Sequence, residues 1–330
     1  MIGITGAGGF IGSHLVESLL SRGEEVMATD IAKEVPPNLE EFKEKRRFHY
    51  ARCDVKSPEA ISAAFSTDTD VILHLASAVG VDRYIGDPVE TIDSIVMGTR
   101  NVLEFSLRRH SKLVFLSTSE VYGKNPKVPW KEDAERVLGP TTVDRWTYST
   151  SKALCEHMIN ATCKVRGLPT TIIRPFNVYG PKQRPTFLIP ATLRRILTGQ
   201  PPLVYDSGCQ TRCFTYVEDL VRGINSCLES ESAIGQTFNL GNESEVTIAE
   251  VVKTALRICH SSLQPVHLNT SQTFGNRYQD IQRRVPDCSR AHRILGWKAE
   301  TSLLRGMEIT AEWMKTHSLA GVGQGQAKPN

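Results

Sequence analysis

The N-terminal stretch IGITGAGGFIG, residues 2–12, decides the fold class of this 330-residue chain. Its first four residues form a short apolar run typical of a buried strand, and Gly6, Gly9 and Gly12 follow at three-residue spacing. Glycines spaced in this way let the backbone turn tightly, approach a pyrophosphate and pack a helix against the strand. Residues 13–20 continue as an amphipathic helix, whose N-terminus would face the phosphates. The stretch therefore predicts a dinucleotide-binding site.

An acidic residue ends the second predicted strand, which runs over residues 25–29 and leads to Asp30. A carboxylate at this point can accept hydrogen bonds from both ribose hydroxyls and repels a 2′-phosphate, so NAD is favoured over NADP. The residues that follow each strand should line the same crevice. The cofactor-binding residues that we expect are Gly6, Gly9, Phe10, Ile11, Gly12, Asp30, Ile31, Asp54, Val55, Leu75, Ala76, Tyr148 and Lys152.

Strand-like and helix-like segments alternate over the first half of the chain. The strand-like runs cover residues 47–53, 71–75, 112–117 and 169–174, and the helix-like runs cover 58–65, 88–109 and 149–166. Alternation of this kind predicts an α/β fold with a Rossmann-type, doubly wound parallel sheet. We expect an NAD-binding domain over 1–175, a smaller, loop-rich C-terminal α/β lobe for the substrate over 176–317, and a disordered tail over 318–330. Segments at about 212–240 are expected to return to the first domain.

Tyr148 and Lys152 stand four residues apart in the sequence WTYSTSK, residues 146–152. On a helix they share one face, and a nearby cation favours the phenolate and lowers the pKa of the tyrosine. Such a tyrosine can take a proton from a sugar hydroxyl while a nicotinamide takes the hydride. The YxxxK pattern alone is common, but with the glycine motif and Asp30 it predicts an NAD-dependent enzyme.

Composition predicts a soluble, cytoplasmic protein. The net charge of +3 is too small and too dispersed to favour nucleic acid or an anionic membrane as a partner. The first strand begins at the N-terminus, which leaves no room for a signal peptide, and no apolar run is long enough to span a bilayer. The eight cysteines lack CxxC spacing and any paired Cys/His cluster, so we expect reduced thiols and no metal site.

Further polar groups are predicted to face the crevice. The motif TSEVYG, residues 118–123, directly follows a strand and offers the Thr118 hydroxyl beside Tyr148 and the Glu120 carboxylate. Guanidinium groups suit the phosphates of a nucleotide diphosphate and the carboxylate of an acidic sugar. The arginines near turns that could serve these groups are Arg145, Arg184, Arg212 and Arg284.

These motifs, with RPFNVYGP (174–181) and RCFT (212–215), resemble extended short-chain dehydrogenases/reductases that act on nucleotide-diphosphate sugars. The resemblance runs from residue 1 to about 317. It implies tightly held NAD, a lobe that grips the nucleotide, and a homodimer built on a four-helix bundle from 88–109 and 149–166. It also implies that C4 of the sugar loses a hydride, which returns after the 4-keto intermediate has reacted. The catalytic residues that it implies are Thr118, Glu120, Tyr148 and Lys152, and the substrate-binding residues are Tyr84, Glu120, Arg145, Asn177, Arg184, Tyr205, Arg212, Tyr278 and Arg284.

Three features bear on the reaction within this family. Ser119 stands where 4,6-dehydratases carry the aspartate that expels water, which disfavours dehydration. RWTY, residues 145–148, resembles the Arg-x-x-Tyr of UDP-glucuronate decarboxylases and UDP-apiose/xylose synthases. Residues 278–280 with Arg284 resemble a substrate-binding tract of the decarboxylases. The resemblance therefore favours decarboxylation of UDP-glucuronate to UDP-xylose or a UDP-4-keto-pentose, with Arg145 orienting the carboxylate.

Two alternatives remain open at this stage. GPKQRP, residues 180–185, resembles UDP-glucuronate 4-epimerases as much as decarboxylases, and such an epimerase also needs an arginine for the carboxylate. A UDP-glucuronate or UDP-glucose 4-epimerase is therefore the alternative within the class. A non-catalytic NAD-binding protein is a second alternative, disfavoured because Tyr148 and Lys152 are both present. The nucleotide base and the fate of the 4-keto product cannot be derived from these residues.

Overall fold

A computed structural model describes residues 1–65, 68–80, 86–269, 272 and 281–317 of the chain. Two residues that the sequence assigns to the substrate site, Tyr84 and Tyr278, lie outside the described residues, as does the tail that we expected to be disordered.

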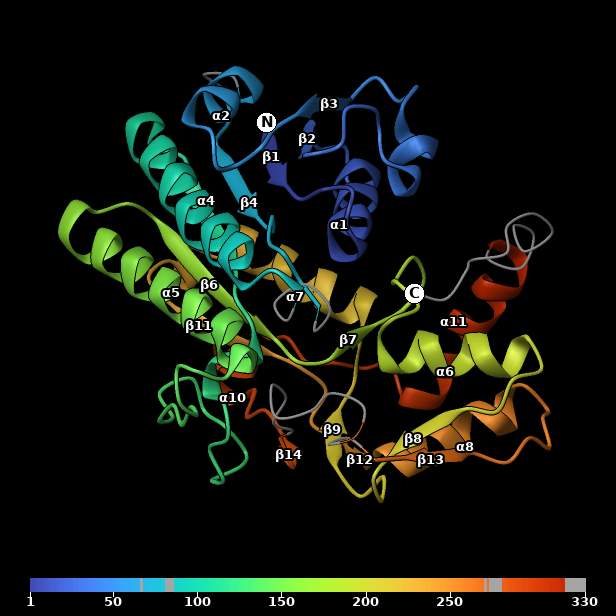
Figure 1. Cartoon of the computed structure of the whole chain (residues 1–330). Coiled ribbons are helices and arrows are strands. Elements are labelled where there is room, and N and C mark those ends of the chain that lie inside the picture. The colour runs from blue at the N-terminus through green and yellow to red at the C-terminus, as the bar shows by residue number, and fades with distance from the viewer. Residues whose placement is uncertain (66–67, 81–85, 270–271, 273–280, 318–330) are drawn as a thin grey trace.

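A seven-stranded parallel sheet forms the centre of the molecule, with the strand order β11-β6-β5-β4-β1-β2-β3 (Figure 1). Its strands are β1 (Ile2–Thr5), β2 (Val26–Asp30), β3 (Phe48–Arg52), β4 (Val71–His74), β5 (Lys112–Leu116), β6 (Thr170–Pro175) and β11 (Thr237–Leu240). From β1 the chain proceeds outward through β2 and β3, and then returns to continue through β4, β5 and β6 on the other side. This doubly wound arrangement confirms the predicted fold class, and its point of reversal between β1 and β4 is where such sheets bind ligands.

Helices cover both faces of this sheet. Successive strand residues face opposite sides, so Leu73 and Val114 join one hydrophobic cluster with residues of α1 and α7. Their neighbours Ile72 and Leu113 join a second cluster with residues of α2, α4 and α5. These helices are α1 (Phe10–Ser21), α7 (Val217–Glu229), α2 (Pro58–Ala64), α4 (Pro88–Arg109) and α5 (Thr147–Arg166). The bounds of α4 confirm the sequence prediction for residues 88–109.

A smaller lobe contains most of the remaining elements. Three helices in contact with one another form its core: α6 (Leu188–Leu197), α8 (Ile248–Ile258) and α11 (Leu303–His317). Its short strands pair as β7 (Val178–Tyr179) with β10 (Thr215–Tyr216), β9 (Thr211–Cys213) with β12 (Glu245–Thr247) and β14 (Arg283–Arg284), and β8 (Leu203–Tyr205) with β13 (Val266–Leu268). The remaining helices of the described residues are α10 (Ser289–Leu295) and the short 3₁₀ helices η1 (Pro37–Phe42), η2 (Ser119–Tyr122), η3 (Asp144–Trp146) and η4 (Glu231–Ala233).

The expectation of a loop-rich segment at the start of the lobe is wrong for α6. Ile189, Leu193 and Ile196 recur at helical spacing and are buried, while Arg194 between them is exposed. This amphipathic pattern is a helix signal that the prolines around it obscured in the sequence.

Candidate active site

The carboxyl ends of the central strands meet along one edge of the sheet, and the predicted site residues follow them there. Gly6 follows β1, Asp30 ends β2, Leu75 follows β4 and Asn177 follows β6. Thr118 follows β5 and begins the turn η2. Because parallel strands place these ends side by side, residues far apart in sequence form a single crevice.

The glycine motif forms a turn into which no side chain would fit. Gly6 has a φ of 70°, and a Cβ placed on it would lie 2.8 Å from the backbone nitrogen of Ala76. A Cβ on Gly12 would lie 2.5 Å from the carbonyl oxygen of Gly6. The helix α1 begins directly after the turn, at Phe10, so its free N–H groups point into the crevice. The turn therefore has the shape and the backbone donors that a pyrophosphate requires.

Asp30 is the last residue of β2, and its side chain also accepts a hydrogen bond from the glycine turn. Its Oδ2 accepts from the Gly8 N–H at 3.0 Å, and its Oδ1 accepts from the Ile31 N–H at 2.8 Å. Asn38, which the sequence analysis missed, donates from Nδ2 to the Gly8 carbonyl at 3.1 Å, and Pro36 packs on Gly8. Asn38 lies thirty residues from Gly8 in a turn without a motif, so only the tertiary structure shows that it belongs to this site.

The other expected cofactor residues line the neighbouring strand ends. Asp54 accepts from the Lys56 N–H at 2.9 Å, which fixes the turn after β3. Val55 is buried, and a Cβ on Gly98 of α4 would lie 2.7 Å from its methyl group. Leu75 and Ala76 donate their N–H groups to the Thr5 hydroxyl, both at 3.2 Å. These contacts fix the backbone around the crevice.

A buried histidine connects the glycine turn to the helix that carries Tyr148. Because the Thr5 hydroxyl accepts two N–H groups, its hydrogen is donated to His74 Nδ1, at 2.7 Å. The proton of His74 is therefore on Nε2, which donates to the Thr99 hydroxyl of α4 at 3.1 Å. Thr99 in turn hydrogen-bonds to Cys155 of α5. Burial lowers the pKa of His74 to about 3, with a further contribution from the charge of Lys152, so this histidine is neutral.

Thr118 contacts Tyr148, and Lys152 lies one helical turn after Tyr148 on α5. The Thr118 side chain hydrogen-bonds with Tyr148 and also accepts from the Glu120 N–H at 3.1 Å. Lys152 donates from Nζ to the Leu116 carbonyl at 2.8 Å, and only 2% of the residue is exposed. The Tyr148 phenol thus has the Thr118 hydroxyl beside it, and the Lys152 ammonium is held at the end of β5, 4.6 Å from the centre of the Phe115 ring.

The pKa of Tyr148 differs from the sequence-based expectation. Burial raises this pKa and the negative charge of Glu120 raises it further, while the hydrogen bond with Thr118 and the charge of Arg284 act in the opposite direction. Burial also lowers the pKa of Lys152 to about 8. In the chain by itself, desolvation therefore outweighs the attraction between phenolate and ammonium that would lower the pKa of the tyrosine.

Glu120 lies at the centre of a buried ion-pair cluster. Its Oε2 is 2.6 Å from Nη2 of Arg145, and its Oε1 is 2.7 Å from Nη2 of Arg284. The exposed fractions of the three side chains are 15%, 4% and 9% for Glu120, Arg145 and Arg284. Burial raises the pKa of Glu120, but the two arginines outweigh it and hold this pKa at about 2. Each carboxylate oxygen thus binds one guanidinium.

A second group of polar side chains adjoins this cluster. Arg284 of β14 lies opposite Arg212 of β9 in the parallel pair, and its Nη1 donates to Asn177 Oδ1 at 3.3 Å. Asn177 adopts a φ of 37° and donates from Nδ2 to the Cys213 carbonyl at 2.9 Å. The structure therefore brings together Asn177, Arg212 and Arg284, three of the residues that the resemblance assigns to the substrate.

The structure places the other two described substrate-binding candidates, Arg184 and Tyr205, in two further segments of the chain. Arg184 donates to the carbonyl of Val79, in the segment after β4, and its guanidinium lies 5.6 Å from the centre of the Phe187 ring. Tyr205 ends strand β8 in the lobe, where it pairs with Leu268 of β13.

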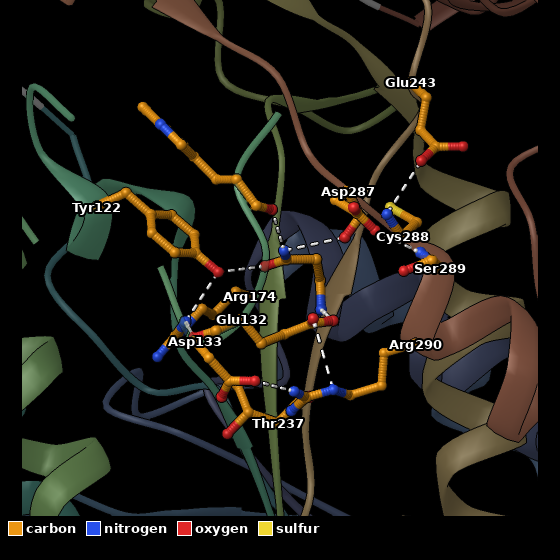
Figure 2. A network of polar contacts seen from close by, with 12 residues as sticks. Tyr122, Glu132, Asp133, Arg174, Thr237, Glu243, Asp287, Cys288, Ser289 and Arg290 are labelled. Carbon is orange, nitrogen blue, oxygen red and sulfur yellow. Dashed lines mark hydrogen bonds and ion pairs between the residues drawn. The ribbon is translucent and has the colours of Figure 1, made fainter. Parts of the chain in front are cut away.

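A buried polar network follows the turn η2, and Figure 2 shows its members Tyr122, Arg174, Glu132 and Arg290. Arg174 of β6 binds Glu156 of α5 through two bonds of 2.9 and 2.5 Å and donates to the Tyr122 hydroxyl at 2.8 Å. Tyr122 donates to Asn239 Oδ1 of β11 at 2.7 Å. These bonds fix the turn η2, which carries Glu120, to two strands of the central sheet and to the helix α5.

The strand that carries Arg284 is tied to the same network. Trp130 donates its N–H to the Val285 carbonyl at 2.9 Å and accepts from the Asp287 N–H at the same distance. Arg290 contacts Glu132 at 3.5 Å and Asp133 at 2.5 Å, as Figure 2 shows. The backbones on both sides of the Glu120–Arg284 ion pair are therefore held in place.

Within the described ranges, no three His, Cys, Asp or Glu side chains gather as metal ligands. Among the helices in that part of the chain, none is long and apolar enough to cross a membrane.

Comparison with known proteins places this site in a family. Residues 4–310 match the family model described as GDP-mannose 4,6 dehydratase. The chain is 34% identical to a UDP-N-acetyl-alpha-D-glucosaminuronate decarboxylase from Bacillus cytotoxicus, over 94% of this chain and 97% of that protein. It is 33% identical to UDP-glucuronic acid decarboxylase 1 from Arabidopsis thaliana, over 92% of this chain and 67% of that protein.

A solved structure is similar over nearly the whole chain. The UDP-glucuronic acid 4-epimerase from Bacillus cereus, solved in complex with UDP-glucuronic acid and NAD, is 27% identical. It superposes with a TM-score of 0.83 over 96% of this chain and 99% of that one.

Proposed function

Because this chain belongs to the GDP-mannose 4,6-dehydratase family of extended short-chain dehydrogenases/reductases, we propose that it is an NAD-dependent decarboxylase of a UDP-hexuronate. UDP-glucuronate is the substrate that we favour, with UDP-xylose or the UDP-4-keto-pentose as the product. The relative from Bacillus cytotoxicus carries a 2-acetamido uronate in its name, so UDP-N-acetylglucosaminuronate is the second candidate substrate.

NAD fits the residues around the glycine turn. The approaches of 2.5 and 2.8 Å that a Cβ on Gly12 and Gly6 would make to the surrounding backbone mean that this turn can close only without side chains at these two positions. We propose that the N-terminus of α1 binds the pyrophosphate and that Asp30 binds the adenosine ribose, with Leu75 and Ala76 along the other side. NAD, when bound, supplies a hydride acceptor and, once reduced, a hydride donor.

Tyr148 and Thr118 provide the proton transfer at C4 in this proposal. The Tyr148 phenolate would take the proton of the C4 hydroxyl as the hydride leaves and so become the neutral phenol, and the Thr118 hydroxyl, which hydrogen-bonds with Tyr148, would hold both oxygens in line. Lys152, 2% exposed, is positioned to bind the cofactor and to supply the positive charge that favours the phenolate.

The proposal of decarboxylation depends on Arg145, which lies in the ion-pair cluster around Glu120 and can bind the C6 carboxylate of the substrate. Oxidation at C4 places a ketone β to the C6 carboxylate, and the bond to CO2 then breaks because its electrons flow into an enolate. Arg145, whose guanidinium lies in a buried ion pair within three residues of Tyr148, would orient that carboxylate. This arginine is the observation that carries the proposal, since neutral sugars offer no partner for it.

We propose that the diphosphate binds to Asn177, Arg212 and Arg284, which the structure brings together on β9, β14 and the segment after β6. Arg284 offers a further donor there, since its buried Nε has no hydrogen-bond acceptor among the described residues. Arg184, Tyr205, Tyr84 and Tyr278 complete the proposed substrate-binding set on the basis of the family resemblance.

A uronate 4-epimerase is the second candidate, supported by the structural similarity to the Bacillus cereus enzyme. In an epimerase the same arginine would hold the carboxylate. The 4-keto sugar intermediate would rotate within the site and be reduced on its other face. Incubation of the purified chain and NAD with a panel of UDP-sugars separates the candidates. A pentose product with CO2 supports the decarboxylase, and UDP-galacturonate supports the epimerase.

We also propose a homodimer through α4 and α5, which lie side by side (Figure 1). Val89, Ile92 and Met97 of α4 are 65%, 42% and 48% exposed, and Leu154 and Val165 of α5 are 48% and 78% exposed. Apolar side chains on two adjacent helices would form a four-helix bundle with a second copy. The cytoplasm is the compartment that we propose, because eight free thiols are typical of reducing compartments.

A further inference from the structure

The tract of residues 180–187 connects the proposed cofactor site with the lobe. It follows β7 and leads into α6, one of the three helices that form the core of the lobe. Its contacts with the first domain are Pro181 with His14 of α1, Lys182 with Glu41 of η1, and Arg184 with Val79 in the segment after β4. These three segments follow or flank the strand ends where we place NAD, so the tract reaches the cofactor site from three sides.

Lys182 adopts a backbone conformation whose cost its side-chain contacts offset. Its φ is 66°, in the left-handed region that disfavours residues with a Cβ. The side chain is 12% exposed, and Nζ lies 2.9 Å from Glu41 Oε1 and 3.7 Å from Glu17 Oε2. Nζ also lies 5.5 Å from the centre of the Phe42 ring. Lys182 therefore binds α1, which carries Glu17, and η1 at the same time.

The short helix η1 also contacts the glycine turn. Asn38, near the start of η1, donates from Nδ2 to the Gly8 carbonyl at 3.1 Å. Leu39 and Phe42 are buried in the hydrophobic cluster that contains residues of α1, so η1 is packed firmly between its two polar contacts. A shift of the Gly8 backbone is therefore passed through η1 to Lys182.

A second connection runs through His14 of α1. Its ring lies edge-on against Phe10, the first residue of α1, with the ring centres 5.7 Å apart. Burial lowers the pKa of His14, so the ring is neutral at neutral pH. Because a carbonyl oxygen can only accept, Nε2 carries the proton and donates it to the Pro181 carbonyl at 3.0 Å. The first turn of α1 is thus bonded to the residue directly before Lys182.

We propose that Lys182 is a positioning residue that couples cofactor binding to substrate binding. NAD at the N-terminus of α1 holds the glycine turn and η1 in the arrangement that binds Lys182, and Lys182 holds the tract so that Arg184 lies at the substrate site. By thermodynamic linkage, a bound UDP-sugar then tightens NAD binding by the same factor. This inference rests on the proposed function, because it takes NAD and a UDP-hexuronate as the two ligands.

The ion pairs of Lys182 determine the size of the coupling and its dependence on salt. Glu17 and Glu41 are 53% and 58% exposed, so water and salt partly screen both pairs. Couplings between two sites are typically roughly 5- to 150-fold, and we expect about fivefold at low salt, near the lower end of this range. At roughly 1 M salt, where the Debye length is about 3 Å, the coupling should decrease.

Equilibrium dialysis of the NAD-loaded chain measures this coupling. The variant Tyr148→Phe is used throughout, because it should bind UDP-glucuronate without oxidising C4. The dissociation constant of NAD is determined with and without saturating UDP-glucuronate, and we expect the sugar nucleotide to lower it by about fivefold. A further Lys182→Gln change should reduce this factor to about one, whereas Lys182→Arg, which keeps the positive charge, should retain most of it.

Three further variants separate the ion pair from the backbone and from folding. Lys182→Gly removes the charge but suits the left-handed conformation, so this chain should fold and still lose the coupling. Glu41→Gln should weaken the coupling, and should add little to Lys182→Gln because both changes remove the same bond. Lys315→Gln, at another ion-paired lysine on α11 of the lobe, is the matched control and should leave the factor unchanged.

The possible results separate the two proposals. UDP-glucuronate that binds to the NAD-loaded chain without changing the dissociation constant of NAD overturns the inference and leaves the proposed function standing. A coupling that persists in both Lys182→Gln and Lys182→Gly also overturns it, since other contacts then join the two sites. Failure of the NAD-loaded chain to bind any UDP-hexuronate overturns the proposed function together with the inference.

Discussion

At the scale of single residues, burial shifts the pKa values of Tyr148 and Lys152 in opposite directions. It raises the pKa of the Tyr148 phenol and lowers that of the Lys152 ammonium to about 8. Both shifts favour the uncharged forms, because charged groups lose more hydration free energy than neutral ones when they leave water. The YxxxK spacing predicted that the two side chains lie near each other, but it could not predict these pKa values, which depend on distant segments such as the one that carries Glu120.

Lys152 should make the stability of the chain depend on pH in alkaline solution. Its pKa is lower in the folded chain than in the unfolded chain, where it is about 10.5. Between pH 8 and pH 10.5 the unfolded chain therefore binds a proton that the folded chain does not, and the free energy of unfolding should rise with pH by up to roughly 1.4 kcal/mol per unit. Urea unfolding of the wild type and of Lys152→Met across this range measures the effect. Equal slopes for the two proteins would contradict the lowered pKa.

Arg145 should matter for acidic sugars only. We expect Arg145→Ala to raise the KM for UDP-glucuronate by about ten- to a hundredfold, because a hydrogen bond to a charged group is worth roughly 1.5–3 kcal/mol. Affinity for UDP alone should barely change, since we place the diphosphate elsewhere. Arg305→Ala, at an arginine that is 67% exposed on α11, is the matched control. An equal loss for UDP and UDP-glucuronate would show that Arg145 only positions the helix of Tyr148.

At the scale of elements, the helix α5, which carries Tyr148, is joined to the strand before the glycine turn through hydrogen bonds in the core. Thr5 of β1, His74 of β4, Thr99 of α4 and Cys155 of α5 form one chain of hydrogen bonds beneath the site. Sequence patterns predicted each of these elements, because burial of an apolar face repeats at the period of a helix or strand. They did not predict the chain itself, since one polar residue per element leaves no pattern.

His74→Phe should therefore destabilise the fold. The change leaves the hydroxyl groups of Thr5 and Thr99 without their buried partner, and an unsatisfied buried polar group costs about 1–3 kcal/mol. His74→Gln retains a nitrogen donor near Thr99 and should lose less. Urea unfolding of the three proteins gives the ranking, and a His74→Phe variant as stable as the wild type would contradict the role of this chain of bonds.

At the scale of the whole molecule, the sequence predicted the doubly wound parallel sheet and the crevice at its strand ends, whereas the contacts between the segments that carry Glu120, Arg145 and Arg284 came only from the structure. The glycine motif and the alternation of elements predict a doubly wound sheet. The meeting of Glu120, Arg145 and Arg284 brings together residues up to 164 positions apart, on turns and a two-residue strand. Short elements of this kind carry little periodicity, so the resemblance to a family, and not a pattern, placed these residues in one site.

The proposed dimer should depend on the apolar faces of α4 and α5. Replacing Met97 and Leu154 with Glu places charges in the centre of the proposed bundle, and we expect the chain to sediment as a monomer. Val266→Glu, at a side chain that is 42% exposed on β13, is the control and should leave the dimer intact. Equal sedimentation of all three proteins as dimers would place the interface on another surface.

The most direct test of the central claim is the product formed from UDP-glucuronate in heavy water. The purified chain is incubated with NAD and UDP-glucuronate, released CO2 is trapped, and the sugar nucleotide is analysed by NMR and mass spectrometry. We expect one equivalent of CO2 and a UDP-pentose or UDP-4-keto-pentose that carries deuterium at C5, because the enolate left by CO2 takes its proton from an exchangeable acid. UDP-galacturonate that keeps its carboxylate, without release of CO2, would contradict the decarboxylase function and identify the chain as a 4-epimerase.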